Sequence, residues 1–216
     1  AVFDLRGCGR STGEPGHVRD FQDYLRDLSA FLEFLKNRYA VHEPIALFGN
    51  SLGGLIATEW ASRNSSRVSK LILSSPLLGL PHEWSFRVLA NFLNRPAAHF
   101  VIHNPIRPPW LTQDQEEVEK YKKDHLIRRR ITIRLVHEML RYSARYQKKG
   151  ASFPFPVYLL MAEKDLVVDP KGTKRFFDRL EAPIKKLEVF PGFYHEIFNE
   201  IEQGFAFERL RHYLST

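Results

Sequence analysis

The sequence predicts an α/β fold, in which a mostly parallel β-sheet is covered by helices on both faces. Two observations carry this prediction. Short apolar runs, typical of buried strands, alternate along the chain with segments of helical periodicity. Between the first such run and the helix after it lies the turn Gly-Asn-Ser-Leu-Gly at residues 49–53. With 216 residues, 44% of them apolar, the chain is long enough to bury a substantial core.

The alternation of strand and helix stops near residue 77 and resumes near residue 151. Residues 77–150 contain apolar segments of helical spacing, broken by prolines, and no convincing strand. We therefore expect an α/β core made of residues 1–76 and 151–216, with residues 77–150 inserted as a helical cap.

The chain begins with a short apolar segment, a loop and a helix. Residues 1–4, Ala-Val-Phe-Asp, are typical of the end of a strand, so N-terminal strands of the sheet are expected to be missing from this sequence. The loop over residues 4–13 contains three glycines, but a phosphate site is disfavoured because no helix opens directly from them. Residues 18–39 predict an amphipathic helix. Its apolar face consists of Phe21, Tyr24, Leu25, Leu28, Phe31, Leu32 and Leu35.

A predicted strand over residues 44–48 and a predicted helix over residues 55–63 enclose the turn at residues 49–53. A serine hydroxyl is a weak nucleophile unless it is exposed beside a base and a pocket that stabilises negative charge. A sharp turn from strand to helix exposes Ser51, and a glycine two positions away on each side leaves room for that turn. We therefore expect Ser51 to be a nucleophile. The alternative is an ordinary glycine-bounded turn.

The remaining elements of the predicted core follow from the same periodicities. They are strands over residues 71–73, 157–161 and 186–190, and helices over residues 171–180 and 202–214. Active sites of parallel sheets gather beyond the carboxyl ends of the strands, so catalytic groups are expected in the loops after these strands.

Two of these loops carry an acid and a base, Asp165 and His195. The chain order Ser51, Asp165, His195 is typical of a serine triad in which the histidine takes the serine proton and the acid orients the imidazole. Asp169 stays open as a rival acid, although Asp165 lies nearer the strand end. The other eight histidines are interpreted as surface or packed residues. No His/Cys grouping has metal-site spacing, so we expect no metal and no cofactor.

Several motifs together resemble a known family, and the resemblance covers nearly the whole chain. They are the loop at residues 4–13, Gly-Asn-Ser-Leu-Gly-Gly at residues 49–54, Ser-Ser-Pro-Leu-Leu-Gly at residues 74–79, Asp165 with Val168, and residues 192–195. The sequence is similar to the monoacylglycerol lipase and lysophospholipase group of α/β-hydrolases. This resemblance implies Ser51 as nucleophile, Asp165 as acid and His195 as base. It also implies the backbone N–H of Leu52 as one donor to the oxyanion.

The sequence departs from this family in two ways. Cys8 and Asn50 stand where the family usually has histidine, which leaves the catalytic groups in place. The family also begins with further strands and a His-Gly loop that supplies a second oxyanion donor, and neither is in this sequence. We therefore expect that the missing segment precedes residue 1 or comes from another chain.

The function predicted from these residues is that of a serine hydrolase. It would cleave the carboxylic ester of monoacyl glycerolipids, either lysophospholipid or monoacylglycerol, through an acyl-enzyme. Two alternatives stay open, a non-catalytic binding protein of the same fold and an esterase for small soluble esters. A lone cysteine, Cys8, and the lack of a signal peptide or of a long apolar run predict a cytoplasmic protein. No nucleic-acid module is present, so nucleic acid is not an expected partner.

The positive charge of the chain is concentrated in one part of the predicted cap. Residues 120–149 contain eleven Lys or Arg and two acids, which gives +9 in a chain whose net charge is +7. Apolar residues at spacings of three or four predict one basic amphipathic helix here. Two interpretations stay open, a solvated helix packed on the core or a helix that contacts an anionic membrane surface.

Overall fold

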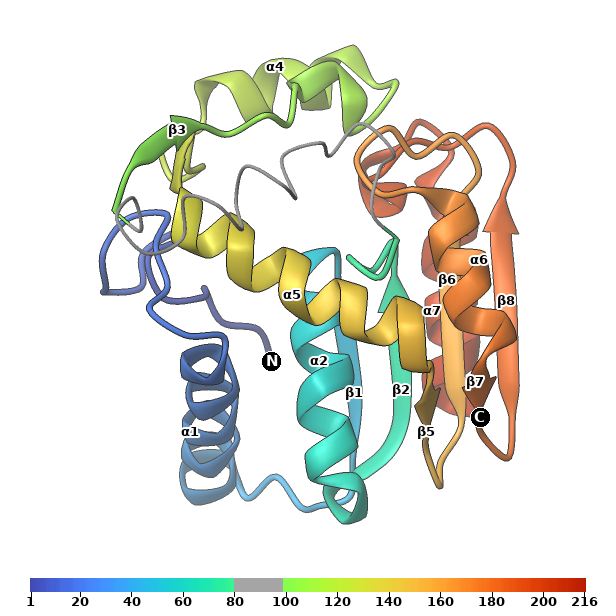
Figure 1. The fold of residues 1–216 in the computed structure, drawn as a ribbon. Coiled ribbons are helices and arrows are strands. Elements are labelled where there is room, and N and C mark those ends of the chain that lie inside the picture. The colour runs from blue at the N-terminus through green and yellow to red at the C-terminus, as the bar shows by residue number, and fades with distance from the viewer. Residues whose placement is uncertain (80–98) are drawn as a thin grey trace. The chain divides into compact units, whose positions relative to one another are not determined.

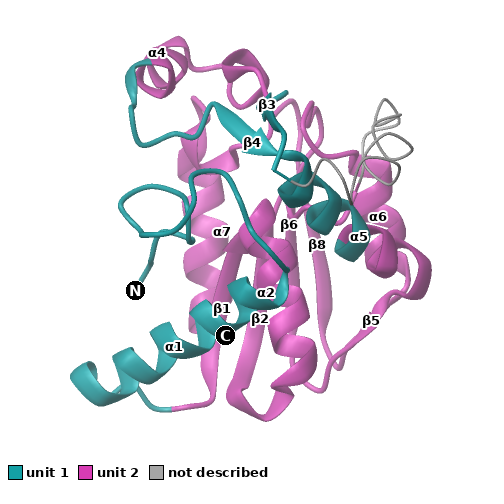
Figure 2. Cartoon of the chain, turned by 60° about the vertical axis from the view of Figure 1, so that its left-hand side comes forward, with its two compact units in different colours: residues 1–42, 82–105, 123–142 teal, residues 43–81, 106–122, 143–216 magenta. Residues whose placement is uncertain are grey.

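A computed structural model of the chain describes residues 1–79 and 99–216. The contacts divide it into two compact units (Figure 2). Unit 1 comprises residues 1–42, 82–105 and 123–142, and unit 2 comprises residues 43–81, 106–122 and 143–216, with residues 80–98 outside the description. These contacts group residues 1–42 with parts of the predicted cap. The functional division into a core and a cap, with boundaries at residues 77 and 150, stays a prediction.

Unit 2 is built on a four-stranded sheet in which every strand pair is parallel (Figure 1). Its strands, in spatial order, are β1 (Ile45–Asn50), β2 (Val68–Ser74), β6 (Val157–Ala162) and β8 (Lys185–Phe190). The two central strands are almost entirely buried, as expected for parallel strands with both faces covered. This is why their sequences are nearly continuous apolar runs rather than alternating ones.

Helices cover both faces of this sheet. In Figure 1, α2 (Leu52–Arg63) and α6 (Pro170–Asp178) lie on one face, and α7 (Gln203–Ser215) lies on the other. Tyr213 of α7 stacks on Tyr158 of β6, with ring centroids 4.3 Å apart. The buried cluster under α7 also contains Ile72, Leu160, Ala162, Phe190, Phe193, Ile197 and Ala206. The predicted fold class, a mostly parallel sheet with helices on both faces, is confirmed.

Short elements complete unit 2. Strands β5 (Ala151–Ser152) and β7 (Leu180–Glu181) form a separate parallel pair. The remaining elements are α4 (Gln115–Lys123), whose last residue belongs to unit 1, and the 3-10 helices Ser65–Arg67, Pro108–Trp110 and Ile197–Asn199. Through residues 1–79 and 99–216, none of the helices combines the length and the apolar character needed to cross a bilayer.

Unit 1 contains α1 (Gln22–Tyr39), β3 (Val101–His103), β4 (Arg130–Thr132) and the first part of α5 (Ile133–Lys149). Helix α1 buries Tyr24, Leu25, Leu28, Leu32 and Leu35, as its periodicity predicts. Just before α1, Phe21 stacks on Tyr142 of α5 with centroids 4.0 Å apart. The Phe21 N–H also donates to the Glu138 carboxylate at 3.1 Å, which connects the start of α1 to α5.

Two predictions about strands are wrong. Residues 1–4 form no strand, and residues 77–150 do contain strands, because β3 and β4 pair with each other in antiparallel register. Each of these strands has only three residues, which is too short for a period-two pattern to be visible in the sequence.

The prediction of one basic amphipathic helix over residues 120–149 is also wrong. Helix α4 ends at Lys123, a turn follows in which Asp124 accepts from the Leu126 N–H at 2.8 Å, and β4 precedes α5. Much of the positive charge has a partner inside its own unit. In unit 1, Arg128 donates to the carbonyls of Gly7 and Gly9, and Arg141 pairs with Glu138.

A fully buried carboxylate connects α2 to α5 within unit 2. Glu59 is 0% exposed, and its oxygens accept from Arg63 Nε at 2.7 Å, Arg145 Nη1 at 3.2 Å and Tyr146 Oη at 2.6 Å. Burial raises the pKa of Tyr146, and its hydrogen bond to Glu59 raises it further. A buried carboxylate is costly unless it is fully paired, so each of these donors is expected to contribute to stability.

Replacing Tyr146 with Phe should therefore destabilise the protein. The change removes the phenol donor and leaves the buried Glu59 carboxylate with one fewer partner, for an expected loss of about 1–3 kcal/mol. Urea unfolding measures it. Tyr39→Phe is the matched control, because Tyr39 is 64% exposed, and its expected effect is within about 0.5 kcal/mol. Equal unfolding midpoints for the two variants would contradict this account.

Candidate active site

The turn between β1 and α2 holds Ser51 in a backbone conformation that L-residues rarely adopt, with φ of 50° and ψ of −118°. Backbone hydrogen bonds hold it there. The Ser51 N–H donates to the Ser74 carbonyl at 2.9 Å, and the Ser51 carbonyl accepts from Leu77 at 2.9 Å and Gly54 at 3.0 Å. A Cβ at Gly49 would lie 2.5 Å from the Gly53 carbonyl oxygen, so only glycine fits there.

The structure brings the three predicted triad residues together within unit 2. His195 Nε2 lies 2.9 Å from Ser51 Oγ, and His195 Nδ1 lies 2.8 Å from Asp165 Oδ2. The side chains of His195 and Asp165 are 2% and 3% exposed. With Nδ1–H donating to the carboxylate, the Nε2 lone pair faces the Ser51 hydroxyl, the arrangement that a general base requires.

Hydrogen bonds between two loops position the acid and the base. The loop after β6 carries Asp165, whose other oxygen accepts from the N–H groups of Val167 and Val168, both at 2.8 Å. The same loop is joined to the His195 loop after β8 by backbone bonds from Glu163 to Phe190 and from Lys164 to Phe193. Asp165 is therefore oriented by its own loop, independently of its contact with the imidazole.

Opposing effects act on the imidazole. Burial lowers the pKa of His195, whereas the hydrogen bond and charge of Asp165, together with the charge of Glu196, raise it. The net direction is upward. Glu196 is held beside the site because its carboxylate accepts from Asn50 Nδ2 at 3.1 and 3.3 Å and its N–H donates to the Leu111 carbonyl. Sequence reasoning missed Glu196, although its position next to His195 was a visible signal.

The rival acid and the predicted oxyanion donor also have clear places in unit 2. Asp169 caps α6, where it accepts from the Lys171 N–H at 3.0 Å and pairs with Arg175 at 3.4 Å. It is thus engaged at the helix start, whereas Asp165 contacts His195. Leu52 is the first residue of α2, directly after Ser51, so its N–H belongs to the positive end of that helix. That end favours negative charge developing near Ser51 Oγ.

Comparisons with known proteins agree with this fold. Residues 1–202 match the family model described as "Serine aminopeptidase, S33". Phospholipase YtpA of Bacillus subtilis is 29% identical, over 96% of this chain and 81% of that protein. Escherichia coli YnbC is 28% identical over 99% of this chain, which spans only 37% of YnbC. A crystal structure of Paleococcus ferrophilus monoacylglycerol lipase has a TM-score of 0.85 at 30% identity, covering 97% of this chain and 79% of that one.

These findings confirm the resemblance that the sequence motifs indicated, and they indicate a carboxylic-ester hydrolase. The family match extends over residues 1–202, and the structural match covers 97% of the chain. The chain therefore belongs to the α/β-hydrolase superfamily, within its monoacylglycerol lipase group.

Proposed function

We propose that this chain carries the catalytic machinery of a serine hydrolase that cleaves the ester of monoacyl glycerolipids through an acyl-enzyme. One observation carries the proposal, the continuous hydrogen-bonded series from Asp165 through His195 to Ser51 at the carboxyl ends of the strands. The relatives support the substrate class, since one is named a phospholipase and another a monoacylglycerol lipase. Both lysophospholipid and monoacylglycerol are compatible with the names of these relatives.

In the proposed first half-reaction, Ser51 Oγ attacks the ester carbonyl carbon while His195 Nε2 accepts the hydroxyl proton. The imidazolium that forms is stabilised by Asp165, and the oxyanion of the tetrahedral intermediate accepts from the Leu52 N–H. Collapse of that intermediate breaks the bond to the glycerol oxygen. The leaving alcohol takes its proton from His195, and the acyl group stays on Ser51.

In the second half-reaction, His195 removes a proton from water, which attacks the acyl-Ser51 carbonyl. The second tetrahedral intermediate uses the same donor, and its collapse releases the fatty acid and returns the proton to Ser51 Oγ. Every proton in the cycle thus passes through His195 Nε2.

Two other functions are weighed against this proposal. A non-catalytic binding protein would have no need for a serine in a strained turn, hydrogen-bonded to a buried histidine. Hydrolysis of small esters, or of peptides as the family description suggests, would use the same three residues. Assays with a panel of esters therefore decide among these substrates. Faster turnover of long-chain monoacyl lipids than of short soluble esters would support the proposal.

Alanine replacement should show Ser51 and His195 acting as one unit. Ser51→Ala and His195→Ala should each lower kcat by at least about 10⁴-fold, and the double variant should be little worse, because triad effects are non-additive. Ester hydrolysis and labelling by a fluorophosphonate probe measure this. Ser62→Ala, an exposed serine on α2, should leave both unchanged. Near-normal turnover by His195→Ala would refute the assignment.

The pH dependence should respond to Glu196. Because the pKa of His195 is raised, the neutral base forms only at higher pH than for an ordinary histidine. Glu196→Gln removes a negative charge that stabilises the imidazolium, which lowers this pKa and should move the acid limb of the kcat/KM profile to lower pH. Glu181→Gln, an exposed residue of β7, is the control and should leave the limb in place. A shift of the limb to higher pH would contradict the argument.

We further propose that exposed basic side chains within residues 120–149 contact anionic lipid surfaces. Lys148 and Lys149 are exposed in the last turn of α5. A basic residue near such a surface contributes about 1 kcal/mol to the free energy of binding. At 0.1 M ionic strength, salt screens this attraction at distances beyond about 10 Å. Individual exposed side chains would make this contact, because the structure excludes a single basic helix.

Reversing both charges, with Lys148→Glu and Lys149→Glu, should weaken binding to phosphatidylserine vesicles at low salt by at least about tenfold. Hydrolysis of a soluble ester should be unaffected. The matched control reverses Lys36 and Arg38, which are exposed in the last turn of α1. Co-sedimentation with vesicles at low and high salt measures the effect. Equal vesicle binding by both double variants would mean that these lysines are only solvated.

A further inference from the structure

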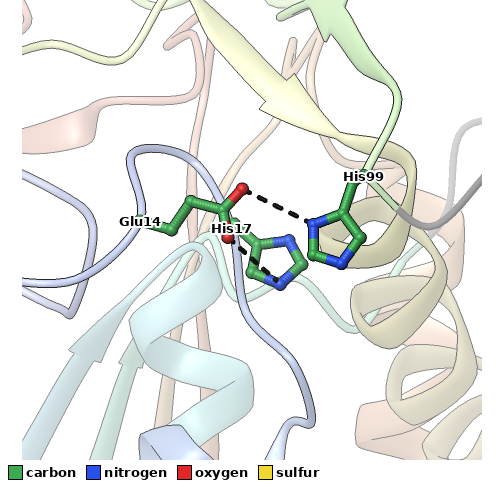
Figure 3. Close-up of side chains that lie close together, drawn as sticks. All are labelled: Glu14, His17 and His99. Atoms are coloured by element: carbon green, nitrogen blue, oxygen red, sulfur yellow. Dashed lines mark ion pairs between the residues drawn. The ribbon is translucent and has the colours of Figure 1, made fainter.

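Three side chains of unit 1 that take no part in the proposed reaction face one another (Figure 3). Glu14 approaches both imidazoles, with one carboxylate oxygen 3.8 Å from His17 Nε2 and the other 3.6 Å from His99 Nδ1. One potential ligand atom from each residue lies within 4.8 Å of the other two. Two imidazoles and a carboxylate are a donor set that transition metals favour.

The backbone holds Glu14 and His17 in a tight turn against β4. The His17 N–H donates to the Glu14 carbonyl at 3.2 Å, and the Gly16 carbonyl accepts from the Thr132 N–H at 2.9 Å. A Cβ at Gly16 would lie 2.3 Å from the Arg130 carbonyl oxygen, so this close approach requires glycine. The turn that carries two of the three side chains is therefore fixed on β4.

Strand pairing brings the third side chain to the same place. In the β3–β4 pair, Val101 lies opposite Thr132, and the Ile133 N–H donates to the Phe100 carbonyl at 3.0 Å. His99 comes directly before this paired stretch, so it lies close to Thr132, whose N–H holds the turn. Its ring stacks on that of His17, with centroids 4.9 Å apart and an angle of 19° between the planes.

A hydrogen bond outside the cluster leaves His17 Nε2 available as a ligand. His17 Nδ1 lies 3.0 Å from Thr132 Oγ1. That oxygen already accepts from the Leu135 N–H at 3.2 Å, and its own proton is directed to the Gly16 carbonyl at 3.4 Å. Thr132 thus accepts from His17 Nδ1–H, and the lone pair of Nε2 faces Glu14. Metal-binding histidines typically have their second nitrogen held in this way.

We propose that Glu14, His17 and His99 bind a divalent transition metal ion, with Zn²⁺ the best match, and leave its fourth position to water. Tetrahedral zinc with bonds of about 2.0–2.1 Å needs ligand atoms about 3.4 Å apart. The three ligand atoms here lie within 4.8 Å of one another, so the exposed side chains of Glu14 and His99 must turn toward His17 Nε2 to complete the site. Mg²⁺ and Ca²⁺ prefer all-oxygen sites and fit poorly. The ion would join the turn at residues 14–17 to His99, and so stabilise unit 1.

Charge and burial are compatible with this assignment. Burial lowers the pKa of His17, an effect that the Glu14 charge opposes and the charges of His99 and Arg134 reinforce. The lowered pKa favours the neutral imidazole, which is the form that binds a metal ion. Glu14 supplies a negative charge that offsets part of the charge of the ion.

The test is calorimetric titration of the chelator-treated purified protein with Zn²⁺, supported by the visible spectrum of bound Co²⁺. We expect one Zn²⁺ per chain, and at least tenfold weaker binding for Glu14→Gln and for His99→Ala. His42→Ala, an exposed histidine of unit 1 outside the cluster, should bind within twofold of the parent. Thr132→Val, which keeps all three ligands but removes the partner of His17, should weaken binding about 10- to 100-fold.

The ligand variants keep the test decisive, because the side chains of Glu14 and His99 are 51% and 75% exposed and their replacement should leave the fold intact. Zn²⁺ should raise the Tm of the parent and of His42→Ala, and leave that of His99→Ala unchanged. The site is refuted if the parent binds no stoichiometric Zn²⁺, or if Glu14→Gln and His99→Ala bind it as the parent does.

Discussion

The proposed active site depends on one backbone constraint, the left-handed conformation of Ser51 between β1 and α2. A residue with a Cβ is strained at a φ of 50°, so the surrounding structure must impose this conformation. It does so through the Ser74 carbonyl at the end of β2 and the Leu77 N–H that follows it. Because β1 and β2 are adjacent parallel strands, their pairing both builds the sheet and fixes the nucleophile. Stability and the proposed chemistry thus share one set of hydrogen bonds.

The electrostatics of the site depend on burying His195 among acids. Burial lowers the pKa of His195, but the hydrogen bond and charge of Asp165 and the charge of Glu196 together raise it above its usual value. Asn50 holds Glu196 from the residue that precedes the nucleophile. Asn50, a neutral donor to the Glu196 carboxylate, thus stands where the family usually has histidine. In our account, residue 50 acts on the base through Glu196 rather than on the substrate.

The predictable parts of this protein were those with a local sequence signal. Buried parallel strands are continuous apolar runs, so the core strands and the loops that carry Ser51, Asp165 and His195 could be located. Strands β3 and β4 are too short for such a signal, and the basic segment was misread because its charge pattern continues through a turn that Asp124 stabilises. The contact of Asn50 with Glu196 and the Glu14, His17 and His99 cluster exist only after folding. For that cluster the sequence showed only the Glu-x-x-His spacing of Glu14 and His17, and gave no sign that His99 would lie beside them.

The central claim is that Ser51 carries the acyl group during turnover. The most direct measurement mixes the enzyme with a saturating long-chain monoacylglycerol, quenches it with acid within milliseconds, and maps the mass of its peptides. Our account predicts a peptide containing Ser51 heavier by one acyl group, formed in the first turnover and absent in Ser51→Ala. Full turnover without any acylated peptide, or with the acyl group on a peptide that lacks Ser51, would contradict it.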